Sequence, residues 1–230
     1  VGLAASRLGP LVDRYLALRG FGDDACLLLV GAAGDRDVVY NCLHCARPVV
    51  RSQRGVWLGR GPGRSWQRDR FRHPYLRESL LDIGYATDTL ETAAPWSQLA
   101  ELRRKVRQIL TGALTDNDER VAVLCHVSHP YRDGASLYFT FFFRCAPSVE
   151  ETIARWARIK RAANRALVAS GATLSHHHGV GQWHAPGLVS ELGEEGVGLL
   201  GAAARRLDPQ GILNPHVLLE PVESLHGVVP

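Results

Sequence analysis

Apolar residues are most concentrated in two neighbouring segments near the middle of the chain. These are 120–129 (RVAVLCHVSH) and 135–145 (ASLYFTFFFRC), and the turn-forming residues Pro130–Gly134 separate them. Short apolar runs bounded by turn residues are typical of β-strands. The pattern therefore predicts a β-hairpin, with further strands at 25–31 (ACLLLVG) and 86–91 (ATDTLE).

Other segments space their apolar residues three and four positions apart, which is the helical period. Ser148, with Glu151 three positions later, is a suitable N-cap for the longest of them, and Gly171 a suitable end. No period is visible in the Pro-, Gly- and Arg-rich segment 48–73, which predicts a long loop. Helices are predicted over 1–20, 34–47, 74–84, 95–114 and 148–170, and near 186–193 and 195–207.

This order of elements predicts an α+β fold. We expect an antiparallel or mixed sheet covered by helices on one face, followed by a helical C-terminal segment. No break in composition marks a second domain, so residues 1–230 are expected to form a single domain.

Composition narrows the class of protein. With 46% hydrophobic residues and a net charge of +4, the chain is not intrinsically disordered. It has no apolar stretch long enough for a transmembrane helix, and its first residues lack the pattern of a signal peptide, so neither is expected. Methionine is absent even at position 1, so we expect a piece of a longer protein, and the preference for arginine over lysine suggests a GC-rich bacterial genome. The five irregularly spaced cysteines suggest reduced core thiols in a cytoplasmic protein.

The most unusual motif is Ser175-His176-His177-His178-Gly179-Val180-Gly181. In an extended conformation His176 and His178 share one face and His177 takes the other. The flanking glycines allow the backbone to approach a ligand closely. Proton transfer, a metal site and a solvated loop are all open readings. A metal needs more ligands than the nearby His184 supplies, and the lone Cys42-x-x-Cys45 is a weak signal, so no metal is predicted.

Two further segments could carry function. Residues 47–77 hold nine arginines and one acid, Asp69, with aromatic residues interleaved, a pattern that suits single-stranded nucleic acid, a phosphorylated small molecule or a solvated surface. In the strand 137–143, alternation places three phenylalanines on the core face and Tyr138 on the opposite face. The phenol of Tyr138 is either part of a site or simply hydrated.

Several motifs together resemble the C-terminal, substrate-binding cap of FAD-linked oxidases of the vanillyl-alcohol oxidase type. Within that group they are most similar to the alkylglycerone-phosphate synthases and their bacterial relatives. The resemblance runs from about residue 20 to 220, and the triple histidine with Gly-Val-Gly is its most specific mark. The motifs are PYLRESLLDIG, TDTLETAAPW, CHVSHPYRDGASLYFTFFF, GATLSHHHGVG and LDPQGILNP.

The resemblance implies an FAD-dependent enzyme whose flavin-binding domain lies N-terminal to this chain. The synthases exchange the acyl chain of acyl-dihydroxyacetone phosphate for a fatty alcohol, without net redox change. By the same resemblance Tyr138, His176, His177 and His178 are catalytic, and Arg77 would bind the substrate phosphate or a flavin-bound anion. His178 and Asn214 are expected to contact the cofactor. The chain alone should have little activity.

Two alternatives to the synthase reading stay open. One is an FAD-linked 2-hydroxy-acid dehydrogenase acting on glycolate or D-lactate. The other is a basic module that binds nucleic acid or anionic lipid headgroups, although no nucleic-acid motif is present and nucleic acid is not the expected partner. The expected partners are a lipid or hydroxy-acid substrate and the protein's own FAD-binding domain. A homodimer and peripheral membrane contact are further options, without an anchor in the sequence.

Overall fold

The computed structural model describes residues 9–22, 25–115, 119–215 and 217–219. The chain divides into two compact units, Val1–Leu76 and Arg77–Pro230, which are considered separately. The expectation of one domain over the whole chain stays a prediction.

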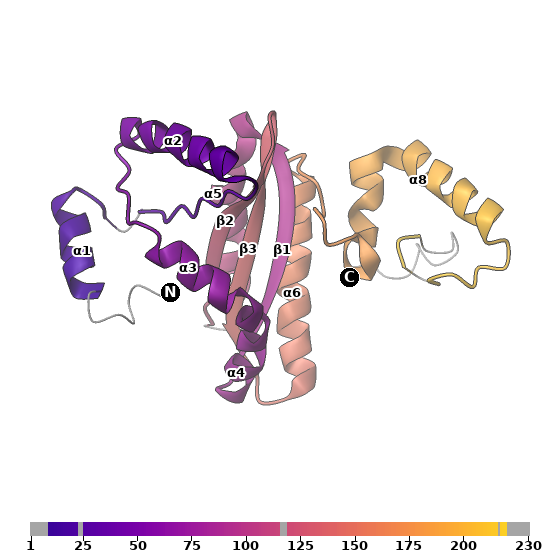
Figure 1. Ribbon diagram of the computed structural model, residues 1–230. Coiled ribbons are helices and arrows are strands. Elements are labelled where there is room, and N and C mark those ends of the chain that lie inside the picture. The colour runs from indigo at the N-terminus through magenta and orange to yellow at the C-terminus, as the bar shows by residue number, and fades with distance from the viewer. Residues whose placement is uncertain (1–8, 23–24, 116–118, 216, 220–230) are drawn as a thin grey trace. The chain divides into compact units, whose positions relative to one another are not determined.

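The second unit contains a three-stranded antiparallel sheet with the order β1-β3-β2 (Figure 1). The strands are β1 (Tyr85–Pro95), β2 (Ala122–Pro130) and β3 (Gly134–Arg144). The expected hairpin joins β2 to β3, and its glycine Gly134 is required, because an added Cβ would collide with the backbone of Ala94. The α+β fold with an antiparallel sheet is therefore confirmed.

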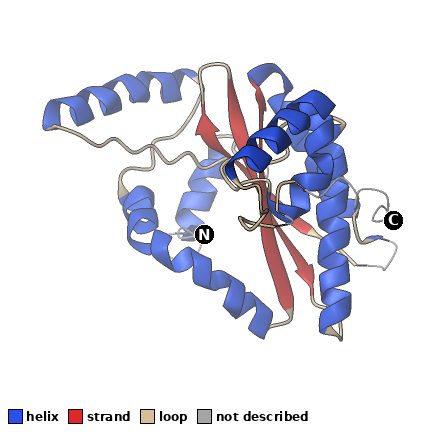
Figure 2. Ribbon diagram, turned by 90° about the vertical axis from the view of Figure 1, so that its right-hand side faces the viewer, coloured by secondary structure: helices blue, strands red, loops and turns tan. Residues whose placement is uncertain are grey.

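Two helices cover one face of this sheet. They are α5 (Trp96–Gly112) and α6 (Val149–Val168), and α6 runs alongside the strands (Figure 2). Ser148 caps α6 as expected, since its side chain accepts a hydrogen bond from the Glu151 amide. Every second residue of β3 enters the core beneath these helices. The largest core side chains include Leu90, Val106, Leu110, Leu137, Phe139, Phe141, Phe143, Ile159 and Leu167.

The helical C-terminal segment is also confirmed. After α7 (Gly181–His184) and a 3-10 turn at Ala185–Gly187, α8 runs over Leu188–Leu207. Gly193 has a φ of 74° and breaks α8 into two parts, close to the boundary expected from the sequence. The short helix α4 (Leu76–Asp82) leads into β1.

The first unit differs from the sequence expectation in two segments. It contains α1 (Gly9–Leu18), α2 (Arg36–Ser52), α3 (Gly61–Asp69) and a 3-10 turn at Arg70–Tyr75. The long loop expected over 48–73 is wrong, because α2 continues through Pro48 and α3 begins at Gly61. The strand expected at 25–31 is also wrong: these residues are irregular and exposed, since no described strand of this unit pairs with them.

The prediction of core thiols is only partly correct. Cys42 and Cys45 are exposed on α2, whereas Cys125 and Cys145 are half-buried. Burial raises the pKa of the Cys125 thiol to about 11, so this thiol is unreactive at neutral pH.

Candidate active site

Polar side chains form a row across the face of the sheet that the helices leave open. Glu91 of β1 and His126 of β2 both lie directly opposite Tyr138 of β3. Residues directly opposite one another in a sheet project from the same face. The ring of Tyr138 accordingly stacks on His126, with centroids 5.0 Å apart. This is the face away from Phe139 and Phe141, as the alternation along β3 predicted.

Backbone hydrogen bonds hold the histidine loop, residues 175–181, beside this row. The amide of Thr173 donates to Ala93 O at 3.3 Å and the amide of His176 donates to Glu91 O at 3.1 Å. The chain then turns, because His177 has a φ of 60°. Few residues other than glycine adopt this left-handed conformation, and histidine is among those that do so more often. The segment is thus a turn rather than the extended strand that the sequence analysis considered.

The carboxylate of Glu91 lies at the centre of the site. It is buried, with 4% of the residue exposed. Ser136 Oγ donates to Oε1 at 2.7 Å, and His176 Nδ1 lies 3.4 Å from the same oxygen. His178 Nε2 lies 3.3 Å from Oε2, and His129 Nε2 lies 3.7 Å from Oε1. One carboxylate therefore contacts three imidazoles.

The ionised form of this carboxylate is favoured despite its burial. Burial raises the pKa of Glu91, but hydrogen bonds from Ser136 and His176 and the charges of His176 and His178 outweigh it and hold the pKa below its usual range. Glu91 is therefore negatively charged at neutral pH and can only accept hydrogen bonds from its neighbours.

The hairpin supplies the remaining members of the cluster. The register of β2 shifts between Val127 and Pro130, a bulge that redirects His129 toward the histidine loop. Tyr131 follows in the turn, and its hydroxyl lies 3.0 Å from His176 Nε2 and 3.2 Å from His177 Nε2. The His129 and His177 rings meet edge to face, with centroids 4.7 Å apart.

Tyr138 differs from Tyr131 in having a hydroxyl that is available to a ligand. Its half-buried ring contacts the edge of His178, with centroids 5.4 Å apart. Among the described residues its hydroxyl has no hydrogen-bond partner. His178 itself is partly exposed, with 37% of its side chain accessible. A phenol and an imidazole therefore face the open side of the sheet together.

The structure brings four of the six predicted site residues together: Tyr138, His176, His177 and His178. It does not bring Arg77 or Asn214 to them. Arg77 is exposed on α4 and makes no hydrogen bond or ion pair within the described part of the chain. Asn214 is exposed in a turn beyond α8, with a φ of 47°. The roles expected for these two residues stay predictions.

Sequence reasoning missed Glu91, His129, Tyr131 and Ser136. A charged residue inside an otherwise uncharged stretch of strand, as in Thr89-Leu90-Glu91-Thr92, was the one local signal for the carboxylate. His129 and Tyr131 lie in or beside the hairpin turn, about 45 residues before the histidines that they contact, and Ser136, just after the turn, contacts Glu91. Only the folded arrangement joins them.

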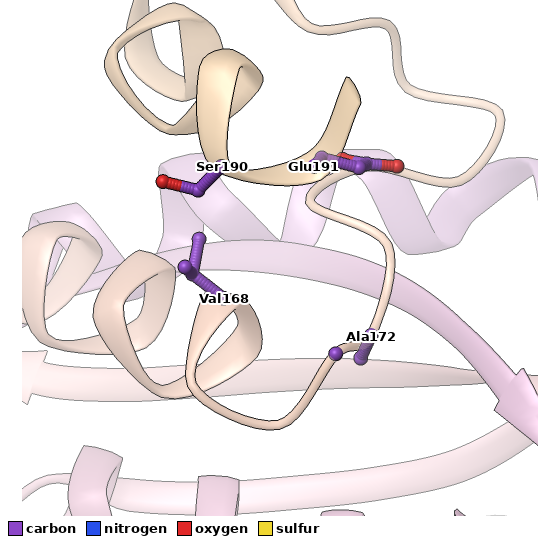
Figure 3. Close-up of a pocket in the computed structure, with 5 residues that line it drawn as sticks. Val168, Ala172, Ser190 and Glu191 are labelled. Atoms are coloured by element: carbon purple, nitrogen blue, oxygen red, sulfur yellow. The ribbon is translucent and has the colours of Figure 1, made fainter. Parts of the chain in front are cut away.

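Other features offer less chemistry. In the described residues, no group of three or more His, Cys, Asp or Glu side chains has an arrangement that would hold a metal ion. A small cavity of about 100 Å³ lies between the end of α6 and α8, lined by Val168, Ala172, Ser190 and Glu191 (Figure 3). The carboxylate of Glu191 already accepts a hydrogen bond of 2.9 Å from the Leu174 amide. The cavity is separate from the histidine cluster.

The cluster fits the ring system of a flavin better than the rest of FAD. Its aromatic rings and imidazoles can stack on, or hydrogen-bond to, a flat heteroaromatic ring. A pyrophosphate instead requires arginine, lysine or a helix N-terminus, and the cluster contains no arginine or lysine. Its residues are therefore suited to cover a flavin ring that another part of the protein holds.

The second unit thus has a sheet with one face covered by helices and one open face that carries acid–base groups. The chain belongs to the family described as FAD linked oxidases, C-terminal domain, whose model matches residues 17–218. FAD is the cofactor of this family, so this domain belongs to the class of FAD-dependent enzymes.

Individual relatives agree on a narrower group. The chain is 32% identical over 221 residues to an alkyldihydroxyacetonephosphate synthase of Trypanosoma brucei brucei, covering 95% of this chain and 36% of the relative. It is 26% identical to the synthase of Dictyostelium discoideum, covering 100% of this chain and 38% of the relative. A solved alkyldihydroxyacetonephosphate synthase shares the fold, with a TM-score of 0.61 and 20% identity over 92% of this chain and 34% of that structure. The chain thus spans less than two fifths of the length of these relatives.

No helix in the described part of the chain is long and apolar enough to cross a membrane. Both synthases named above come from eukaryotes. The expectations of a bacterial source, a cytoplasmic location and a homodimer stay predictions.

Proposed function

We propose that this chain is the substrate-binding and catalytic cap of an FAD-dependent enzyme of the alkyldihydroxyacetonephosphate synthase type. The reaction exchanges the acyl group of acyl-dihydroxyacetone phosphate for a fatty alcohol. The observation that carries the proposal is the cluster of Tyr138 and three consecutive histidines on the open face of the sheet. Its setting is a chain that belongs to the FAD-linked oxidase family and matches synthases over nearly its whole length.

The exchange requires a proton to leave the carbon of the dihydroxyacetone unit that carries the acyl group. Imidazole is the side chain best suited to remove it near neutral pH. His178 and His177 are the exposed members of the triple histidine and are the candidate bases. The available hydroxyl of Tyr138, beside His178, donates to a substrate oxygen and carries the proton onward.

The phosphate of the substrate needs a fixed cation. Arg77 is the proposed group, because a guanidinium binds phosphate through two parallel hydrogen bonds and because the Arg77 side chain has no competing partner among the described residues. FAD, when bound by the rest of the protein, supplies the electrophilic ring on which the exchange depends. The cap's residues place the substrate, exclude water and move the proton.

Anaerobic absorbance of the full-length, flavin-loaded protein tests the substrate class. Palmitoyl-dihydroxyacetone phosphate is added to one cuvette, and glycolate or D-lactate to another. Bleaching by the first alone, reversed by a fatty alcohol with release of an ether product, supports the proposal. Bleaching by a hydroxy acid, reversed only by an electron acceptor, would replace the synthase with a dehydrogenase.

Paired variants test the roles of the residues. Tyr138→Phe and His177→Ala should abolish turnover while the flavin spectrum and the cooperative melting of the protein are retained. Tyr85→Phe, at the far end of β1, and His44→Ala, on α2, are the matched controls and should leave turnover unchanged. Loss of solubility in the site variants alone would indicate a structural role.

The basic-module alternative predicts instead salt-dependent binding of nucleic acid by the arginine-rich segment.

A further inference from the structure

Glu91 lies beneath the histidines and faces away from any substrate that approaches the open side of the sheet. Its side chain is 3% exposed, whereas that of His178 is 37% exposed. Within the described part of the chain, every polar contact of its carboxylate is with a member of the cluster: Ser136, His129, His176 or His178. A group in this position acts on substrate only through the rings that it touches.

The chemistry of a carboxylate fixes the direction of these contacts. An ionised carboxylate has no proton to donate, so a ring nitrogen that hydrogen-bonds to it must carry one, and its negative charge also favours the tautomer with a proton on a ring nitrogen that merely faces it. His176 hydrogen-bonds to Glu91 through Nδ1, whereas His178 faces it through Nε2 in an ion-pair contact of 3.3 Å. In the neutral rings, the unprotonated nitrogen is then Nε2 of His176 and Nδ1 of His178. One carboxylate thus sets opposite tautomers in two residues of the same loop.

Tyr131 extends this order to the third histidine. Its hydroxyl is within hydrogen-bond distance of Nε2 in both His176 and His177 but has only one proton. The unprotonated Nε2 of His176 accepts that proton's hydrogen bond. The oxygen of Tyr131 must then accept from a protonated Nε2 of His177, and Nδ1 of His177 is left as the basic nitrogen.

We propose that Glu91 is a positioning residue that fixes the tautomers of His176 and His178 directly and that of His177 through Tyr131. The inference deepens the proposed function, on which its catalytic meaning rests. It identifies the basic atoms of the two exposed histidines as Nδ1 in both cases. Both bases are prepared for the same proton transfer before substrate arrives.

The test is long-range ¹H–¹⁵N spectroscopy of the full-length, flavin-loaded protein labelled with ¹⁵N at histidine. The ring nitrogens report directly whether they carry a proton. We expect Nδ1–H in His176 and Nε2–H in His177 and His178. A wild-type spectrum with His176 protonated at Nε2 alone would overturn the proposal without any variant.

Variants extend the test. Glu91→Gln replaces an acceptor-only group by one that also donates, so His176 or His178 should change tautomer, and turnover should fall about 100-fold. Tyr131→Phe should change the tautomer of His177 and leave the tautomer of His178 unchanged. Glu101→Gln, on the exposed face of α5, is the control and should change neither property. Unchanged histidine tautomers in Glu91→Gln would contradict the proposal.

The spectra are recorded without substrate, so they separate this proposal from the proposed function. Failure of palmitoyl-dihydroxyacetone phosphate to react, with tautomers as expected, removes the synthase and leaves Glu91 as the organiser of the cluster. A working synthase with other tautomers removes Glu91 from this role.

Discussion

The two faces of the sheet receive alternate residues of the same strands, yet they differ in almost every physical property. On one face Phe139, Phe141 and Phe143 are at most 1% exposed and pack beneath two helices. On the other face Tyr138 and Glu91 form a polar row that meets the histidine loop. The comparison teaches that the apolar face supplies stability to the fold, and the open face uses that rigidity to hold titratable groups in register.

The largest effect on stability is expected on the apolar face. Phe141→Ala removes a fully buried ring and leaves a cavity, which should lower the free energy of unfolding by about 3–5 kcal/mol. Phe142→Ala is the control: Phe142 is the next residue, is half-buried and lies on the open face, so its loss should lower the free energy of unfolding clearly less. Denaturant midpoints of the full-length protein measure both. Equal losses would show that the two faces contribute equally to stability.

A second prediction concerns a titratable group on the helix side. His184 is buried, and its Nδ1 lies 2.9 Å from Asn164 Oδ1 on α6. Burial, together with the charges of Lys160 and His178, lowers the pKa of His184 to about 4, although Asp88 raises it. The folded state therefore resists protonation of this ring at pH values where the unfolded chain accepts a proton.

The consequence is a stability that falls in mild acid. The contribution of neutral His184 is complete above about pH 6.5 and is lost as the pH falls toward 4, by about 3 kcal/mol in total. His184→Gln should remove most of this dependence of stability on pH. The pKa of His126 is also lowered, chiefly by burial, so part of the dependence remains. Unfolding at a series of pH values measures it, with the exposed His44→Gln as control. An unchanged slope in His184→Gln would assign the acid sensitivity to other groups.

The same contrast explains how much could be predicted from the sequence. The alternation in β3 and the spacing in α5 and α6 predicted the sheet, its covered face and the position of Tyr138. This was possible because buried positions recur at every second residue of a strand and at every third or fourth residue of a helix. The strand expected at 25–31 failed because apolar content does not supply a partner strand. The helix over 61–69 was missed because its Gly, Pro and Arg content hides any period.

The site was predictable only where its residues are adjacent in sequence. The three histidines and Tyr138 stand out in the chain, and the family resemblance adds to them. Glu91 and Tyr131 reach the histidines only through strand register, a bulge in β2 and a left-handed turn at His177. None of these three features has a periodic signature, so the polar floor of the site emerges only in the folded structure.

A smaller loss of stability is expected at Ser136, a buried residue on the face of the sheet that the helices leave open. Ser136 is fully buried, donates to Glu91 at 2.7 Å and accepts from the His129 amide at 3.0 Å. Ser136→Ala leaves both partners without this hydroxyl and should cost about 2 kcal/mol. The exposed Ser97→Ala on α5 is the control. A neutral result would mean that water replaces the hydroxyl and that the floor of the site is open to solvent.

The smallest effect on stability belongs to the residue with the largest expected effect on turnover. Tyr138→Phe removes a hydroxyl that has no partner among the described residues and keeps the ring that stacks on His126. The free energy of unfolding should change by less than about 0.5 kcal/mol, which is typical of substitutions that break no buried contact. Turnover of the flavin-loaded protein should nevertheless be lost. Chemical unfolding and turnover are measured on the same preparation, because the comparison of the two faces depends on their divergence at this residue. A loss of more than about 1 kcal/mol would show that the hydroxyl of Tyr138 has a buried structural role, and the division between a face for stability and a face for chemistry would fail at its central residue.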